Sequence, residues 1–194
     1  MTRIVGEVMT REVVGAHRDT PFKDVARLLD EHRISGLPVV DHDDKVVGVI
    51  SGTDLIRRQA ARPVTGRAPT AGDLMSTPAI TVHPEQRVPE AARVMERHGV
   101  ERLPVVDEED RLIGIATRRD LLRVFLRTDE EIRREIYDDV LGGAPRRPGR
   151  ALDVSVRDGV VTLSGSSAQP SDLTSLIRLT WRVDGVVGVV SRPT

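Results

Sequence analysis

The chain has 194 residues, of which 30 are acidic and 29 are basic, so its net charge is −1. This balance argues against a protein dedicated to polyanions, and aromatic residues at 2% are too few to build a base-stacking platform. The absence of cysteine excludes disulfide frameworks, thiolate zinc sites and cysteine nucleophiles. The composition predicts a globular protein of one large or two small domains and makes nucleic acid a poor candidate partner.

Targeting signals are not visible in the sequence. The opening stretch, MTRIVGEVMTREVV, is interrupted by charges, and no run approaches the roughly 18 apolar residues that span a bilayer. We therefore expect a cytoplasmic location.

The first two thirds of the chain repeats itself at an offset of 66 residues without a gap. The segment LPVVD at 37–41 returns at 103–107. Other matched pairs are Met9 and Met75, His17 and His83, His32 and His98, Gly48 and Gly114, and Asp54 and Asp120. Because chance does not preserve a constant register over this length, we infer a tandem duplication.

Each copy predicts the order strand, helix, strand, strand, helix. A short apolar segment (12–16 or 79–82) precedes a stretch with apolar residues at helical spacing (22–29 or 88–95). LPVV then predicts a buried strand, a polar turn follows, VVGVI or LIGIA predicts a second strand, and a helix begins near Asp54 or Asp120. Proline lacks an amide donor, so we expect strand pairing to be interrupted at Pro38 and Pro104.

The pattern changes from Thr128, where a helix cap and an acidic first turn are predicted. A loop rich in Gly, Pro and Arg occupies 142–150. The segment ALDVSVRDGVVTLSG then alternates apolar and polar residues around Asp158-Gly159, which is typical of a β-hairpin. A further helix and a closing strand are expected, with Trp181 in the core of this small domain.

These segments resemble two known families. The duplicated unit, with Val8-Met9-Thr10, Leu74-Met75-Ser76 and both LPVVD strands, is similar to a pair of CBS domains, or Bateman module. The tail, with VSVRDGVVTLSG and VDGV, resembles a BON domain. The fold class implied is α/β (α+β), with two tandem β-α-β-β-α CBS units packed as a pair and a small α-β-β-α-β BON-like domain. We place CBS domain 1 at 1–60, a linker at 61–70, CBS domain 2 at 71–126 and the BON-like domain at 127–194.

The resemblance also implies a function. CBS pairs bind adenosine nucleotides such as AMP, ADP, ATP or S-adenosylmethionine as regulatory ligands, and they signal occupancy to a partner domain. BON domains are associated with phospholipid surfaces. We therefore expect a non-catalytic regulatory protein with an adenosine nucleotide as ligand and no catalytic cofactor or metal.

The resemblance places the nucleotide contacts around the strand ends and the turns that follow them. In the family an Asp in this turn accepts hydrogen bonds from the ribose hydroxyls, which suits an ionised carboxylate. The expected nucleotide-binding residues are Val14, Gly36, Leu37, Pro38, Ser51, Thr53, Asp54, Ile80, Arg102, Leu103, Pro104, Thr117, Arg118, Arg119 and Asp120. Arg102 lies where relatives present a cation to phosphate, and Gly36 lacks that cation. The alternative is that Ser51, Asp54, Thr117 and Asp120 are only helix caps.

Partners follow from the same resemblance. We expect a homodimer through the CBS pair, as isologous dimers form, and a peripheral contact with anionic lipid at the inner membrane face through Arg146, Arg147 and Arg150. Two alternatives remain open, namely an interaction scaffold with vestigial nucleotide clefts, and an enzyme or nucleic-acid binder that uses the arginine clusters.

Overall fold

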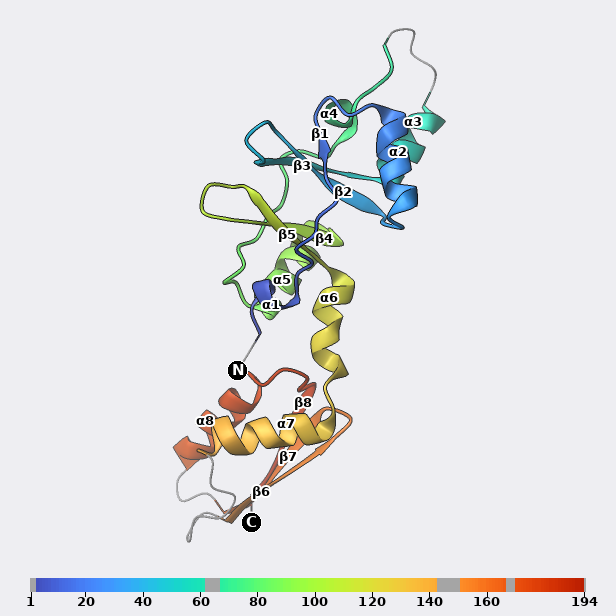
Figure 1. The fold of residues 1–194 in the computed structure, drawn as a ribbon. Coiled ribbons are helices and arrows are strands. Elements are labelled where there is room, and N and C mark those ends of the chain that lie inside the picture. The colour runs from blue at the N-terminus through green and yellow to red at the C-terminus, as the bar shows by residue number, and fades with distance from the viewer. Residues whose placement is uncertain (1–2, 62–66, 143–150, 167–169, 194) are drawn as a thin grey trace. The chain divides into compact units, whose positions relative to one another are not determined.

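The computed structural model describes residues 3–61, 67–142, 151–166 and 170–193 (Figure 1). The chain divides into two compact units. The repeat unit comprises Ile4–Arg118, and the tail unit comprises Met1–Arg3 with Arg119–Thr194. The two units are described separately below.

The first copy in the repeat unit contains three helices and a three-stranded sheet among its described residues. Its elements are α1 (Val5–Val8), β1 (Ala16–His17), α2 (Phe22–Glu31), β2 (Gly36–Val40), β3 (Val46–Ser51) and α3 (Gly52–Ala60). The sheet order is β1-β2-β3, with β1 parallel to β2 and β2 antiparallel to β3. Helices α2 and α3 lie side by side (Figure 1).

The second copy follows the same plan with a shorter first strand. Its elements are α4 (Ala71–Leu74), α5 (Val88–His98), β4 (Arg102–Val106), β5 (Leu112–Thr117) and the start of α6 (Arg118–Leu122), whose residues from Arg119 belong to the tail unit. The strand predicted at 79–82 is reduced to one bridge between Val82 and Val105. In the first copy, the strand predicted at 12–16 is also wrong in its bounds, since only Ala16 and His17 pair with β2.

The first strands are short because the residues before them pair with the other copy. Thr10 and Ile115 exchange two backbone hydrogen bonds of 2.9 Å, so the segment before β1 joins β5. Val49 and Ser76 exchange the equivalent pair at 3.1 and 2.9 Å, so the segment after α4 joins β3. The segment around Thr10 in the first copy therefore pairs with the sheet of the second copy, and the segment around Ser76 in the second copy pairs with the sheet of the first. Each sheet is completed by the other copy.

The buried strands predicted from LPVV are confirmed. Leu37, Val39, Leu103 and Val105 are all fully buried, and in the first copy they pack with Val25 and Leu29 of α2 and other residues of the core. The expected interruption at Pro38 is wrong, because Pro38 stays in register with Val49 and the irregularity lies one residue later. An antiparallel strand directs only alternate residues into the hydrogen bonds with one neighbour, so a proline at an intervening position is tolerated.

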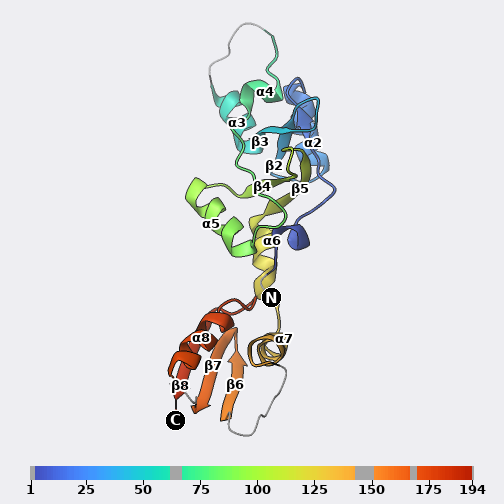
Figure 2. The same cartoon turned by 90° about the vertical axis from the view of Figure 1, so that its left-hand side faces the viewer.

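The tail unit is a sheet covered on one face by helices (Figure 2). Its elements after α6 are η1 (Arg123–Leu126), α7 (Asp129–Glu135), η2 (Ile136–Val140), β6 (Ala151–Arg157), β7 (Val160–Ser166), α8 (Pro170–Thr180) and β8 (Gly188–Pro193). The sheet order is β6-β7-β8, antiparallel and then parallel. The predicted hairpin is confirmed, since Arg157 pairs with Val160 and the turn residues Asp158 and Gly159 both have positive φ.

The predicted core position of Trp181 is wrong, because 52% of this residue is exposed. Helix α8 packs Leu176 and Ile177 against the core and then buries Thr180, whose hydroxyl donates to the Leu176 carbonyl at 2.8 Å. Trp181 comes after Thr180, the last residue of α8, so the helix no longer holds its ring against the core.

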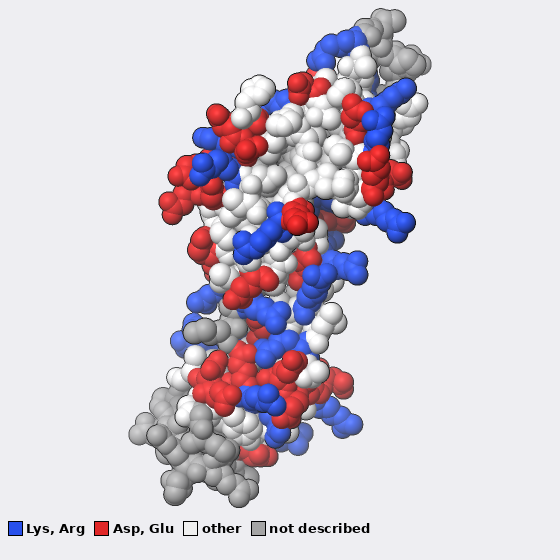
Figure 3. Space-filling model, viewed as in Figure 1, with Lys and Arg blue, Asp and Glu red and all other residues white. Residues whose placement is uncertain are grey.

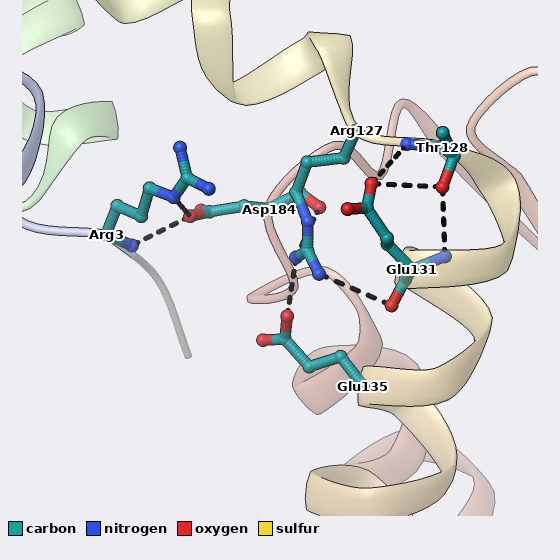
Figure 4. A network of polar contacts seen from close by, with 6 residues as sticks. All are labelled: Arg3, Arg127, Thr128, Glu131, Glu135 and Asp184. Atoms are coloured by element: carbon teal, nitrogen blue, oxygen red, sulfur yellow. Dashed lines mark hydrogen bonds and ion pairs between the residues drawn. The ribbon is translucent and has the colours of Figure 1, made fainter.

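A polar network fixes the start of α7 (Figure 4). Arg127 donates to the Glu135 carboxylate and to the carbonyls of Asp184 and Glu131 at 3.2 and 3.3 Å. Thr128 and Glu131 form the predicted cap, in which the Glu131 carboxylate accepts from the Thr128 backbone amide at 2.8 Å. The buried Asp184 carboxylate accepts from the Arg3 backbone amide at 2.9 Å. Residue 3 is therefore held by the small domain through a side chain near the end of the chain.

Candidate functional site

The predicted turn of the first copy is a helix cap. Ser51 ends β3, and its hydroxyl and backbone amide both donate to Oδ2 of Asp54, at 2.6 and 2.8 Å. The Asp54 amide in turn approaches the Ser51 hydroxyl at 3.4 Å. Asp54 Oδ1 lies 3.9 Å from Arg57 Nη1, and 16% of the side chain is exposed. The cap therefore uses one carboxylate oxygen, while the other retains capacity to accept from a hydroxyl group.

The strand start and the turn of the first copy lie together. Gly36 pairs with Ser51 in the β2–β3 register, and the Gly52 amide at the start of α3 donates to the Ser35 carbonyl at 3.0 Å. Leu37 and Pro38 are buried, whereas Thr53 is exposed. The register thus brings predicted residues of two separate segments to one end of the sheet.

The second copy has the same arrangement among its residues that belong to the repeat unit, which ends at Arg118. Arg102 pairs with Thr117, and the Arg118 amide donates to the Glu101 carbonyl at 3.0 Å. Leu103 and Pro104 are buried, and the Arg118 side chain is exposed. The predicted residues Val14 and Ile80 are both half-buried, and Val14 packs against the first-copy core.

The other two predicted residues of the second copy belong to the tail unit. Arg119 is exposed, and Asp120 is buried, with its Oδ1 3.6 Å from Arg123 Nη1. Both lie on α6, which begins directly after Thr117. Thr117 ends β5 and Asp120 follows three residues later, just as Ser51 ends β3 and Asp54 follows three residues later.

Arg102 makes the contact that sequence reasoning missed. Its Nη1 donates to the Gly36 carbonyl at 2.6 Å, and its Nη2 donates to the Ser35 hydroxyl at 2.6 Å. A Cβ atom at residue 36 would lie 3.0 Å from the guanidinium carbon and 2.8 Å from the Ile50 carbonyl. The absence of a side chain at Gly36 thus leaves room for the Arg102 guanidinium. Arg102, which was predicted to contact phosphate, donates its hydrogen bonds to protein groups in this structure.

The electrostatic environment of Arg102 is partly apolar. Burial lowers the pKa of its guanidinium, and the nearby Glu101 carboxylate opposes that shift. Both acceptors of the Nη groups, a carbonyl and a hydroxyl, are uncharged. An anionic acceptor would form a stronger hydrogen bond with this group than either of them.

Metal binding and nucleic-acid binding are the other kinds of site to be considered. No group of three or more His, Asp or Glu residues there could hold a metal ion. The Asp41 carboxylate instead caps its own turn, since Oδ1 accepts from the amides of Asp43 and Lys45 at 2.9 and 3.0 Å, and these bonds lower its pKa. Basic and acidic side chains are interspersed over the face shown in Figure 3, which argues against a polynucleotide surface there.

Two features concern membranes. None of the helices described here is both long and apolar enough to cross a bilayer. The arginines predicted to contact lipid, Arg146, Arg147 and Arg150, lie outside the described residues.

Comparison with known proteins confirms both resemblances. The CBS domain family matches residues 5–61 and 71–127, and the BON domain family matches residues 128–192. An uncharacterised protein of Methanopyrus kandleri is 35% identical over 120 residues, which is 62% of this chain and 61% of that protein. The matched region covers 22% of the inosine-5'-monophosphate dehydrogenase and 39% of an uncharacterised protein of Methanocaldococcus jannaschii.

Solved CBS pairs share the fold of the repeat unit. The CBS domain pair of protein MJ0100, in complex with 5-methylthioadenosine and S-adenosyl-L-methionine, is 29% identical, with a TM-score of 0.59 over 64% of this chain and 97% of that chain. CBSX2 of Arabidopsis thaliana, in complex with AMP, is 32% identical, with a TM-score of 0.56 over 64% of this chain and 96% of that chain. The predicted fold class is confirmed.

Proposed function

Because the chain belongs to the CBS domain family and carries a BON domain after its CBS pair, we propose that it is a non-catalytic regulatory protein whose CBS pair binds adenosine nucleotides. One observation carries the proposal. Each copy ends its second hydrophobic strand in Ser or Thr, places Asp three residues later at the start of a helix, and pairs that strand end with the start of LPVV. The similar CBS pairs that hold AMP or S-adenosyl-L-methionine support the choice of ligand.

The residues of each turn suit different parts of a nucleotide. Asp54 would accept ribose hydroxyls through Oδ1, because Oδ2 is already used in the cap. Asp120 is the equivalent acceptor in the second copy. The exposed Arg118 and Arg119 occupy the places of Gly52 and Thr53. The second site should therefore prefer phosphorylated ligands, and the first should tolerate adenosine.

A thermal-shift screen of adenosine, AMP, ADP, ATP and S-adenosylmethionine tests this function. A ligand at about 100 times its Kd stabilises the fold by roughly 2.7 kcal/mol, which raises Tm by about 5 to 10 °C for a chain of this length. Each variant is compared with its own unliganded Tm, because Asp54 also caps α3. We expect Asp120→Asn to remove most of the AMP shift and Asp54→Asn to retain much of it.

A second candidate is an interaction scaffold whose nucleotide sites are vestigial. It is favoured by the fact that Asp54 and Arg102 already bond to protein groups. The two candidates make opposite predictions for calorimetry. If no adenosine compound produces heat of binding or raises the Tm of the wild-type chain at millimolar concentration, the nucleotide sensor is wrong and the scaffold is favoured.

The BON domain is the part of the chain that we propose passes the signal on, to a partner or to an anionic membrane surface. Arg146, Arg147 and Arg150 are the proposed lipid contacts, since polybasic segments bind anionic headgroups. Co-sedimentation with phosphatidylglycerol vesicles measures this contact. Binding that is unchanged when all three arginines are replaced by Gln would show that the segment does not contact lipid.

A further inference from the structure

Arg102 and Gly36 are equivalent positions of the two copies that contact each other. They are 66 residues apart, which is the repeat offset, and the side chain of the second reaches the backbone of the first. Each residue begins an LPVV strand, Gly36 that of β2 and Arg102 that of β4. A single guanidinium therefore joins the corresponding ends of the two sheets.

Both ends of this contact lead directly to a predicted nucleotide turn. On the first-copy side, Gly36 pairs with Ser51, and Ser35 accepts from the Gly52 amide at the start of α3. On the second-copy side, the backbone of Arg102 pairs with Thr117, which precedes Arg118. Arg102 is therefore connected to both proposed sites, through the hydrogen bond of its side chain to Gly36 in the first copy and through the pairing of its backbone with Thr117 in the second.

The acceptors of Arg102 are weaker than a phosphate would be. Its Nη groups donate to the Gly36 carbonyl and the Ser35 hydroxyl, both uncharged. Hydrogen bonds from arginine to phosphate are charge-assisted and roughly twice as strong as neutral ones. A phosphate placed beside Thr117 and Arg118 would therefore compete with Ser35 and Gly36 for the same guanidinium.

We propose that Arg102 couples the two nucleotide sites: it holds Ser35 and Gly36 while the second site lacks a phosphate, and it transfers to the phosphate of a nucleotide bound there. This inference rests on the proposed nucleotide binding. Release of Ser35 and Gly36 loosens the strand end that supports Ser51, so a phosphorylated ligand in the second site weakens binding in the first. Adenosine has no phosphate to recruit Arg102 and leaves the sites independent. By linkage, the effect is the same in both directions.

Calorimetry on single-site variants measures the coupling. In Asp54→Asn and in Asp120→Asn, titration gives the association constant of the one site that remains. The product of these two constants is compared with the product of the two stepwise association constants of the wild-type chain. For AMP we expect the wild-type product to be about five- to tenfold smaller, a typical size for coupled sites, and for adenosine we expect no difference. Repeating the set with Arg102→Gln should abolish the difference for AMP, whereas Arg93→Gln, at an exposed position of the same unit, should retain it.

Two further measurements keep the inference testable if Arg102→Gln does not fold. Ser35→Ala removes one of the two acceptors and should reduce the coupling without removing the arginine. In the wild-type chain, the Arg102 Nε–H resonance should shift with AMP and stay in place with adenosine. If AMP binds at two sites with no coupling, or with coupling that Arg102→Gln leaves unchanged, the inference is wrong while the proposed function stands. If AMP does not bind at all, both fail.

Discussion

The substitution Gly48→Ala tests how the two copies interlock. Gly48 lies in β3, and an added Cβ would be 2.5 Å from Sδ and 2.8 Å from Cγ of Met75, and 2.9 Å from the Ser76 carbonyl. That carbonyl accepts the backbone hydrogen bond of Val49 at 3.1 Å. The new methyl group would therefore push apart the two segments that the copies exchange.

The equivalent substitution Gly114→Ala is a matched control inside the same chain. The three atoms nearest to its Cβ would all belong to the Met9 side chain, namely Sδ, Cγ at 3.1 Å and Cε at 3.3 Å. A methionine end can change rotamer, whereas a bonded carbonyl cannot move without losing its partner. Overpacking costs about 1 to 3 kcal/mol, so we place Gly48→Ala near 2 to 3 kcal/mol and Gly114→Ala near 1 kcal/mol.

One opposing effect reduces both values. Replacing Gly by Ala at a compatible backbone position stabilises a protein by about 0.4 to 1 kcal/mol through the unfolded chain. The net loss should then be about 1 to 2.5 kcal/mol for Gly48→Ala and close to zero for Gly114→Ala. Since 1 kcal/mol corresponds to about 2 to 4 °C in a chain of this size, Tm should fall by about 2 to 10 °C in the first variant only.

Calorimetric melting of the two variants, with and without a second substitution, provides the assay. Met9→Ala should cancel the overlap in Gly114→Ala, but Met75→Ala should relieve only part of that in Gly48→Ala, because the Ser76 carbonyl stays in place. Equal Tm values for the two glycine variants, or full rescue by Met75→Ala, would refute the reasoning that the bonded Ser76 carbonyl makes Gly48 the less tolerant position.

Three further outcomes are expected. Arg127→Met should destabilise the small domain by about 2 kcal/mol in urea unfolding, because the Arg127–Glu135 pair is only 16% exposed on each side; a loss under about 0.5 kcal/mol would contradict this. The hydrogen bond from the Thr128 amide is the largest of the effects that lower the pKa of Glu131 below its ordinary 4.5. The stability that ionised Glu131 contributes is therefore present above pH 4.5 and is lost as the pH falls through the lower pKa of the folded state. Glu131→Gln should flatten that acid dependence in circular-dichroism melts. Light scattering should give about twice the chain mass of 21.4 kDa, and Ile56→Glu, at a residue 72% exposed on α3, should give the monomer mass; a wild-type monomer at micromolar concentration would exclude the homodimer.

The parts of the fold that follow local rules could be predicted from the sequence. Both LPVV strands are buried, and this was predictable because the same run of apolar residues occurs in both copies. The Asp158-Gly159 turn is predictable because two successive residues with positive φ favour this pair of residue types. The Thr128 cap is predictable because its partner, Glu131, lies three residues away.

The parts that depend on distant pairing could not be predicted in this way. No strand is predicted around Thr10 or Ser76, because each segment pairs with a residue far away in the sequence, Ile115 and Val49 respectively. Trp181 has apolar neighbours in the sequence, but α8 ends at Thr180. The position of that helix end, which the apolar pattern does not give, decides whether the ring packs against the core.

The contact of Arg102 with Gly36 also depends on distant pairing, and it follows from the duplication. In a paired repeat, equivalent residues near the axis that relates the copies come close to each other, so they cannot be chosen independently. An arginine at residue 36 would place a Cβ 2.8 Å from the Ile50 carbonyl and a second cation against the guanidinium of Arg102. Glycine in one copy is therefore the condition for arginine in the other. The inequality of the two predicted sites is thus a packing requirement at the contact of the copies, in addition to any preference for ligand.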